Sequence, residues 1–196
     1  MSKQKLIQII FVLAAVAGIS YIIVSSSGNE GVKKSFLDFW NKKSETGNVT
    51  LGENPIDKSG LTEEYISPDF GFSFKYPKGF NVSELDDDSG HTVLVQSYEV
   101  EPRKGFQIYI SEFDEPEPLT AERILQDLPP SEVIDPKGVL IGEGKAINAV
   151  IFLSTSPSFG KTREIWFARE GFLYQVTTYE GQDNFIGPIL ETFRFE

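Results

Sequence analysis

The side chains with the most evident chemical potential lie in one short stretch, "ELDDDSGH", at residues 84–91. Any Ser–His–Asp relay would have to use His91, because it is the only histidine in the chain of 196 residues. A lone histidine that enters a strand after a glycine turn is more often a surface residue, and we expect no catalytic role for it. The carboxylates of Asp86, Asp87 and Asp88 are oxygen ligands of the kind that Ca²⁺ takes. An EF-hand loop, however, needs glycine where this run has serine. We therefore interpret the run as a solvated turn, with a weak calcium site as the alternative.

Two glycine-containing motifs match nucleotide-binding loops only in part. A phosphate-binding loop that ends in "FGKT" (159–162) needs an earlier glycine where Thr155 stands. The stretch "GEGKA" (142–146) lacks the third glycine and the following helix of a dinucleotide-binding fingerprint. The chain also has no cysteine, which excludes disulfides, thiol catalysis and cysteine-ligated zinc. We expect no cofactor and no enzymatic activity, and a hydrolase that uses carboxylates is the remaining enzymatic alternative.

Charge is distributed unevenly along the chain, whose formal net charge is −11. Residues 1–43 carry six lysines and two acidic residues, whereas residues 44–196 carry 12 basic and 27 acidic residues. A nucleic-acid-binding domain needs a basic footprint against the phosphate backbone, so the acidic body argues against nucleic acid as a partner. The same charge disfavours a body that lies flat on an anionic membrane.

The apolar run at residues 6–24 predicts a membrane span. It holds no charged side chain, and at about 1.5 Å per residue it extends roughly 28 Å, close to the hydrocarbon thickness of a bilayer. We interpret it as an uncleaved signal anchor in the lipid bilayer. A cleaved signal peptide, cut after "AVA" at 15–17, and a buried soluble helix are the alternatives. The predicted anchor includes Leu6, Phe11, Leu13, Ile19 and Val24.

The orientation of the span follows from the flanking lysines. Lys3 and Lys5 favour a short cytoplasmic tail at residues 1–5, although Lys33 and Lys34 after the span favour the opposite orientation. We expect a single-pass protein of the cytoplasmic membrane with its N-terminus inside and its C-terminal domain outside the cytoplasm. The absence of cysteine favours a bacterial exported protein, because secreted eukaryotic domains often use disulfides.

Residues 25–64 predict a juxtamembrane segment followed by a flexible linker. Phe36, Phe39 and Trp40 recur at helical spacing among lysines, which favours a short interfacial helix at the level of the lipid headgroups. The alternatives are a piece that packs on the globular domain or one that extends the anchor helix into water. Residues 44–64 are rich in glycine, serine, asparagine and threonine without periodicity, which is typical of a tether.

From residue 65 onward the apolar pattern changes to a period of two, which predicts strands. Phe70, Phe72, Phe74 and Tyr76 share one face of the first strand, and the proline that follows ends it. Residues rich in β-branched and aromatic side chains predict further strands at 91–100, 105–113, 145–156, 162–170 and 172–181. A tight turn at 169–171 joins the last two of these strands.

Two helices interrupt the predicted strands. The first covers 119–128 with Thr120 as its N-cap, and the second covers 184–193, where Pro188 is tolerated only in a first turn. A short last strand follows at 192–195. The fold class is therefore α+β: an antiparallel sheet flanked by short helices in a globular domain at 65–196, preceded by one N-terminal transmembrane helix.

Three segments of this domain resemble the PsbP-like family, named for an extrinsic subunit of the photosynthetic oxygen-evolving complex. They are "FGFSFKYPKGF" (70–80), "FLYQVTT" (172–178) and "ILETFRF" (189–195). The resemblance implies an α/β/α sandwich around an antiparallel sheet, and its motifs are structural rather than catalytic. Photosynthetic members have a cleaved targeting peptide, whereas a retained anchor is predicted here. The resemblance therefore implies a membrane-anchored, bacterial-type member rather than a photosystem subunit.

The sequence thus predicts a non-enzymatic extracytoplasmic domain that acts as a protein-interaction or assembly module of the cell envelope. Phe159, in the tip "SPSFG", is the candidate partner contact, because an exposed aromatic side chain can anchor an interface. The other interpretation of Phe159 is a side chain folded onto the end of the sheet. A small-molecule or lipid-binding module of the same fold is the alternative function.

Overall fold

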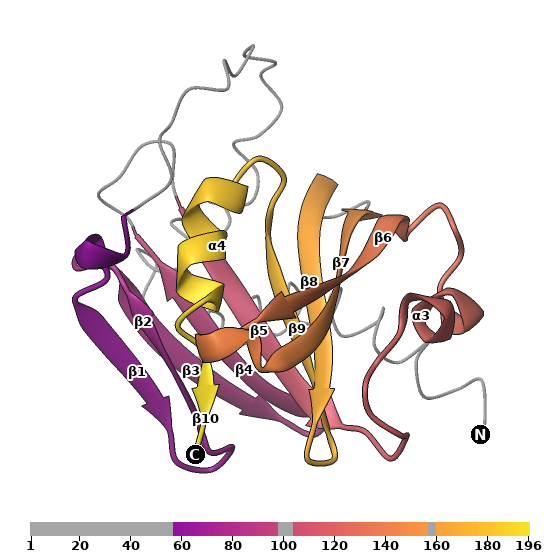
Figure 1. Ribbon diagram of the computed structural model, residues 1–196, viewed down its shortest axis with the longest axis horizontal. Helices are drawn as coiled ribbons and strands as arrows, with labels where there is room; N and C mark the ends of the chain where they lie inside the picture. Colours follow the sequence, from indigo (N-terminus) through magenta and orange to yellow (C-terminus); the bar gives the residue numbers. More distant parts are fainter. Residues whose placement is uncertain (1–56, 98–103, 157–159) are drawn as a thin grey trace, which may run out of the picture.

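Ten strands and two α-helices form the part of the chain that the computed structural model describes, residues 57–97, 104–156 and 160–196 (Figure 1). The strands are β1 (Glu63–Ser67), β2 (Phe72–Tyr76), β3 (Asn81–Asp87), β4 (Gly90–Gln96), β5 (Gly105–Glu112), β6 (Ile134–Ile141), β7 (Ile147–Ser156), β8 (Gly160–Arg169), β9 (Phe172–Tyr179) and β10 (Arg194–Phe195). The helices are α3 (Ala121–Asp127) and α4 (Asp183–Leu190), and short 3₁₀ turns cover Lys58–Gly60 and Glu143–Lys145.

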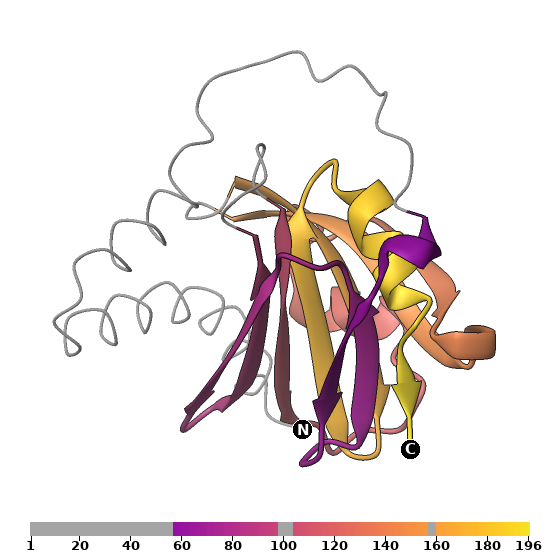
Figure 2. The same cartoon turned by 90° about the vertical axis from the view of Figure 1, so that its left-hand side faces the viewer.

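The strands form two antiparallel sheets. The large sheet has seven strands in the order β3-β4-β5-β9-β8-β7-β6, and the small sheet has three in the order β1-β2-β10. The small sheet brings together the two ends of the domain, since Ser73 of β2 pairs with Arg194 of β10. Seen from the side, the small sheet and α4 lie along one face of the large sheet (Figure 2). The predicted antiparallel α+β class is confirmed for the described residues.

The main core lies between the large sheet and the layer made of the small sheet and α4. Phe72 and Phe74 of β2 are 1% and 0% exposed. Both rings stack on Phe193, with centroid distances of 5.7 and 5.0 Å, and Phe72 also meets Tyr174 of β9 edge-on at 5.7 Å. Each buried ring contributes roughly 1.5–3 kcal/mol through removal of apolar surface from water. The predicted role of the alternating aromatics as one face of a core strand is confirmed for Phe72 and Phe74.

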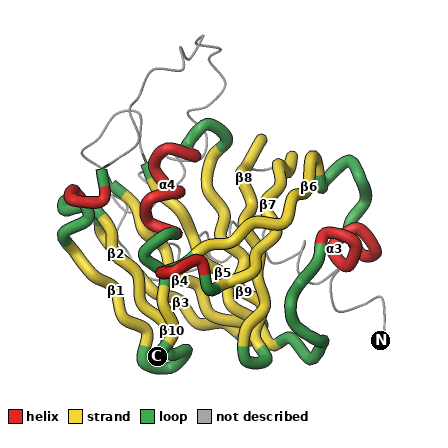
Figure 3. The backbone as a smooth tube through the Cα atoms, in the orientation of Figure 1, coloured by secondary structure: helices red, strands yellow, loops and turns green. Residues whose placement is uncertain are grey.

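A second, smaller core lies on the opposite face of the large sheet and includes residues of α3. Figure 3 shows α3 beside the β6 end of that sheet. Ile124 of α3 is 1% exposed and belongs to the same apolar cluster as Phe152 of β7 and Trp166 of β8. The last two rings meet edge-on at a centroid distance of 5.1 Å. Neighbouring residues of β8 serve the two cores in turn, because successive side chains of a strand point to opposite faces. The outer layers are thus α3 on one side and a mixture of sheet and helix on the other.

Three strands, β1, β3 and β6, were not predicted from the sequence, and each is an edge strand of its sheet. No residue of β3 is buried, and Ile141 is the only buried residue of β6. β3 and β6 are exposed or only half-buried along almost their whole length, so their sequences lack the apolar pattern that predicts a strand, and β1 buries only Tyr65 and Ser67. The start of β1 at Glu63 also corrects the predicted boundary between linker and domain at 64/65. Leu61, inside the predicted linker, is only 5% exposed.

Both predicted helices are present, and one prediction about them is wrong. Thr120 caps α3 as predicted, with its Oγ1 accepting a hydrogen bond of 3.2 Å from the amide of Arg123. Pro188, however, lies in the interior of α4 rather than in its first turn. A proline there removes one backbone hydrogen bond of the helix. Burial of the apolar face of α4 compensates for this loss; that face comprises Phe185, Ile186, Ile189 and Leu190.

Several sequence predictions fall outside the described residues. They concern the anchor at 6–24 with Leu6, Phe11, Leu13, Ile19 and Val24, the interfacial aromatics Phe36, Phe39 and Trp40, and the tip residue Phe159. Within the part of the chain that the structure describes, neither helix has the length and apolar character needed to cross a bilayer.

Candidate interaction site

His91 lies at the start of β4 between two carboxylates of β3. Its Nδ1 is 2.7 Å from Oδ1 of Asp86, its cross-strand partner, and the ring of Phe70 lies 5.1 Å from the imidazole. Its Nε2 is 3.4 Å from Oε2 of Glu84 without making a hydrogen bond. His91 is 7% exposed, so the expectation of a surface histidine is wrong. Its side chain lies on the same face of β4 as that of Val93, which points into the main core between the sheets. Among the described residues no hydroxyl group bonds to Nε2, so no Ser–His–Asp relay is assembled there.

The three aspartates proposed as calcium ligands serve different purposes in the β3–β4 hairpin. Asp86 faces His91, whereas Asp87 points to the other face of β3 and accepts hydrogen bonds from the amides of Ser89, at 2.7 Å, and Gly90, at 3.1 Å. Asp88 lies exposed in the turn. In the described ranges no group of three or more His, Cys, Asp or Glu side chains is arranged to hold a metal ion. The carboxylates of this hairpin do not converge on one point.

Glu164, which was not predicted as a site residue from the sequence, is a carboxylate buried in the middle of β8. It is 1% exposed. One oxygen accepts a hydrogen bond of 2.6 Å from the hydroxyl of Thr162, and the other accepts from the hydroxyl of Thr177, at 2.7 Å, and the indole of Trp166, at 3.1 Å. Burial raises the pKa of Glu164, and the three hydrogen bonds offset part of that rise.

The sequence contains part of the pattern that marks the cluster around Glu164, but that pattern does not show whether the carboxylate is buried. Glu164 shares its strand face with Thr162 and Trp166, and a charged residue in an otherwise apolar strand requires partners if it is buried. The partner from β9, Thr177, comes from another part of the sequence and is placed only by the strand register. With this little exposure, Glu164 offers no access to a substrate, and we interpret the cluster as part of the core.

An open groove lies between the start of α3 and the outer strands β6 and β7. Its volume is about 560 Å³, and its two walls are residues 118–122 and residues 138–140 with 148–150. Leu140, on the second wall, is 54% exposed. Two more large apolar side chains are exposed on the same elements, Leu125 of α3 and Ile134 of β6, each at 39%. Of the described residues, only Ile66 is a comparably exposed large apolar side chain elsewhere. Apolar exposure is therefore concentrated around this groove.

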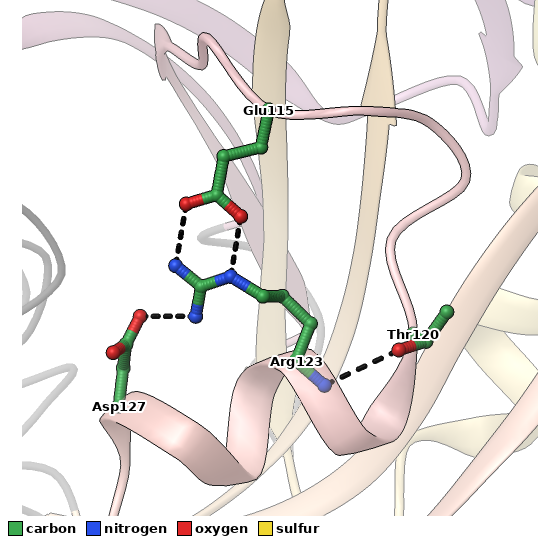
Figure 4. A network of polar contacts seen from close by, with 4 residues as sticks. All are labelled: Glu115, Thr120, Arg123 and Asp127. Atoms are coloured by element: carbon green, nitrogen blue, oxygen red, sulfur yellow. Dashed lines mark hydrogen bonds and ion pairs between the residues drawn. The ribbon is translucent and has the colours of Figure 1, made fainter. Parts of the chain in front are cut away.

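The helical wall of the groove is held by one arginine (Figure 4). The guanidinium of Arg123 donates hydrogen bonds from Nε and Nη2 to both carboxylate oxygens of Glu115, and from Nη1 to Asp127 one turn further along α3. The hydrogen bonds from Arg123 lower the pKa of Glu115, and the same bonds raise the pKa of Arg123. Glu115 precedes the helix, so this network fixes the loop to α3 and, together with the cap from Thr120, makes a rigid wall.

The other wall ends in the outermost strand of the large sheet. β6 pairs with β7 on one side, and no described strand pairs with its other side. The pairing register shifts between Ile134 and Lys137, where Asp135 has a φ of 50° and is followed by proline. Beyond this bulge the pairing is regular from Lys137 to Ile141. The regular half of β6, which contains Leu140, therefore has an open edge among the described strands.

Comparison with known proteins gives a match in structure alone. No family model matches the chain, and no curated protein matches it. Among solved structures, the solution structure of cyanobacterial PsbP (CyanoP) from Synechocystis sp. PCC 6803 is similar, with a TM-score of 0.51. The identity is 12%, and the match covers 80% of this chain and 100% of that chain. The described domain therefore has a PsbP-like fold, which confirms the resemblance at the level of fold.

Proposed function

We propose that this protein is a membrane-anchored, extracytoplasmic interaction module that binds another protein of the cell envelope through the groove between α3 and β6. The observation that carries the proposal is the concentration of exposed apolar side chains on the two elements that build the groove. Such a patch costs solubility in a monomer unless a partner covers it. The apolar run at 6–24 and the lysines before it supply the proposed anchor and its orientation.

The chemistry of the groove supports binding rather than catalysis. Glu122 is the only ionisable side chain among its lining residues. General acid–base catalysis needs a positioned donor and acceptor with tuned pKa values, and one exposed carboxylate cannot supply both. The PsbP-like fold is consistent with this proposal, because the similar solved structure is a PsbP protein.

A photocrosslinking amino acid at position 140 tests the proposal in intact cells. We expect Leu140 replaced in this way to crosslink a second envelope protein. The same replacement at Ile66, which is 53% exposed on the small sheet, serves as the control and should recover far less of that protein. Crosslinks from position 140 only to lipid or a small metabolite would favour the alternative ligand-binding module, and equal recovery from both positions would contradict the proposed site.

The proposed orientation is tested separately. Protease added to intact spheroplasts should degrade the domain without lysis, because the domain lies outside the cytoplasm. A domain that survives in intact spheroplasts and is cut only after lysis would show that the orientation is reversed.

A further inference from the structure

We infer that the partner contributes an extended, basic segment that adds to the large sheet along the outer edge of β6. This inference rests on the proposed function and specifies the chemistry of its partner. Three features of the described residues carry it: an edge strand with an open side, a groove placed beside that edge, and an acidic segment, 114–135, that includes the helical wall.

The backbone of β6 is suited to accept another strand only in its second half. An edge strand presents a row of backbone N–H and C=O groups that a further strand can pair with. The bulge at Ile134–Lys137 and the proline at 136 interrupt that row at one end. Regular pairing from Lys137 to Ile141 leaves a short, uninterrupted edge at the other end. The expected segment is therefore short.

The side chains of β6 determine what the added strand presents to the groove. Gly138 and Leu140 lie on one face of the strand and line the groove, while Val139 between them packs toward the main core. A Cβ atom built on Gly138 would meet no atom within 4 Å, so space is open at that position. One or two apolar side chains of the added strand would fill this space against Leu140 and Val150, which faces Gly138 across the β6–β7 pair.

The charge of the segment that includes the helical wall favours a basic partner. Residues 114–135 contain seven acidic side chains and one basic side chain, Arg123. Arg123 bonds to Glu115 and Asp127, and the two negative charges of these carboxylates outweigh its single positive charge. Glu122 lies exposed within the groove, and Asp135 is exposed at the bulge of β6. This charge favours lysine and arginine next to the apolar positions, and it disfavours a second copy of this acidic chain or an anionic lipid surface.

Binding of a model strand by the full chain tests the inference. The protein is placed in zwitterionic phosphatidylcholine nanodiscs, and fluorescence anisotropy is measured with a labelled decapeptide of alternating lysine and valine. We expect saturable binding that weakens as salt is added, and no binding of the alternating glutamate–valine decapeptide. A lysine–valine peptide with central prolines has the same charge but cannot form a continuous strand, and it should bind at least about tenfold more weakly.

Matched variants locate the binding site. Leu140→Ser should weaken binding of the lysine–valine peptide by about tenfold, because it removes a large apolar contact, and Ile66→Ser should change it less than about twofold. Glu122→Gln should weaken binding at low salt more than Glu63→Gln, which removes an exposed carboxylate from the small sheet. All four substitutions change exposed residues, so we expect every variant to fold, and thermal unfolding checks this.

The outcomes separate this inference from the proposed function. Equal binding of the proline-containing peptide, or equal loss in the Leu140→Ser and Ile66→Ser variants, would overturn strand addition at β6. The second readout is the sequence of the partner peptide that is crosslinked to position 140 in intact cells. A basic, extended segment of a partner supports the inference, whereas an acidic or helical segment overturns it and leaves the interaction function intact. Crosslinks to no protein at all would overturn both.

Discussion

Replacement of the buried carboxylate of Glu164 gives the most quantitative test of the structure. Glu164→Ala removes the acceptor for two hydroxyl groups and one indole N–H, all in a site that is 1% exposed. The hydroxyls of Thr162 and Thr177 can turn to other acceptors, but the indole N–H of Trp166 cannot. One unsatisfied buried donor costs about 1–3 kcal/mol, and the cavity left by the side chain adds a similar amount. We expect the free energy of unfolding to fall by about 2–6 kcal/mol, a large part of the typical total.

Glu164→Gln should behave differently. Its amide oxygen can accept from Trp166 and Thr177, and its amide nitrogen can donate to the oxygen of Thr162, as a protonated carboxyl group would. Burial raises the pKa of Glu164 above the ordinary value of 4.5, so folding favours the protonated form. The stability that protonation contributes is therefore fully present below about pH 4.5 and is lost as the pH rises through the folded-state pKa. The wild-type protein should lose stability across that window, and the Glu164→Gln variant should lose less.

Urea unfolding of the full chain in detergent micelles, followed by tryptophan fluorescence, measures both effects. The chain has two tryptophans, so a Trp40→Phe background leaves Trp166 as the only fluorescent reporter, and this residue bonds directly to Glu164. Midpoints are compared at several pH values for wild type, Glu164→Gln and Glu164→Ala. If Glu164→Gln were as destabilising as Glu164→Ala near neutral pH, the ionised carboxylate would be the favoured form in the folded protein. That result would refute the reasoning about burial.

The remaining predictions concern the groove wall and the hairpins. Arg123→Met should lower the free energy of unfolding by about 1–3 kcal/mol, because it leaves the half-buried carboxylate of Glu115 without its partner. Arg123 depresses the folded-state pKa of Glu115, so the stability that the pair contributes is lost as the pH falls through that pKa. The difference between the variant and the wild type should therefore shrink below pH 4.5. Thr120→Ala should cost about 1 kcal/mol through loss of the N-cap, measured by thermal unfolding, and an unchanged melting temperature would contradict the cap. Gly90→Ala should be strongly destabilising, since its Cβ would lie 2.3 Å from a backbone carbonyl of β5. The Cβ of Gly138→Ala meets no neighbour, so this variant should be close to neutral. Equal melting temperatures for the two variants would argue against the β4–β5 geometry.

How far the sequence predicts the fold depends on where each strand lies in its sheet. Interior strands such as β5, β8 and β9 are buried on both faces, and their dense β-branched and aromatic residues make them easy to recognise. The edge strands β3 and β6 are largely exposed, so their sequences resemble loops. The helix α3 was predictable because Thr120 and the apolar positions that follow give both a start and a period.

The candidate site was harder to predict for a different reason. The walls of the groove come from segments around 118–122, 138–140 and 148–150, and their residue types are ordinary. The Arg123–Asp127 pair has the spacing of neighbouring helical turns and could be anticipated. The contact of Arg123 with Glu115 depends on the path of the loop before α3, which no local pattern encodes. Glu164 likewise gains its partner Thr177 only through the register of β8 and β9.

The pairing of β2 with β10 in the small sheet affects when this sheet can form during synthesis of the chain. The side chains of Ser73 and Arg194 are hydrogen-bonded across 121 positions of sequence, so β2 cannot pair with β10 until residues 194–195 have been synthesised. Contacts between such distant residues slow folding. A nascent or truncated chain that stops before Phe193 would leave Phe72 and Phe74 without the ring on which both stack. Such a chain would keep the contacts of these rings with Tyr174 and Phe106 but expose the side that Phe193 covers, and that apolar surface is what proteases and chaperones would meet.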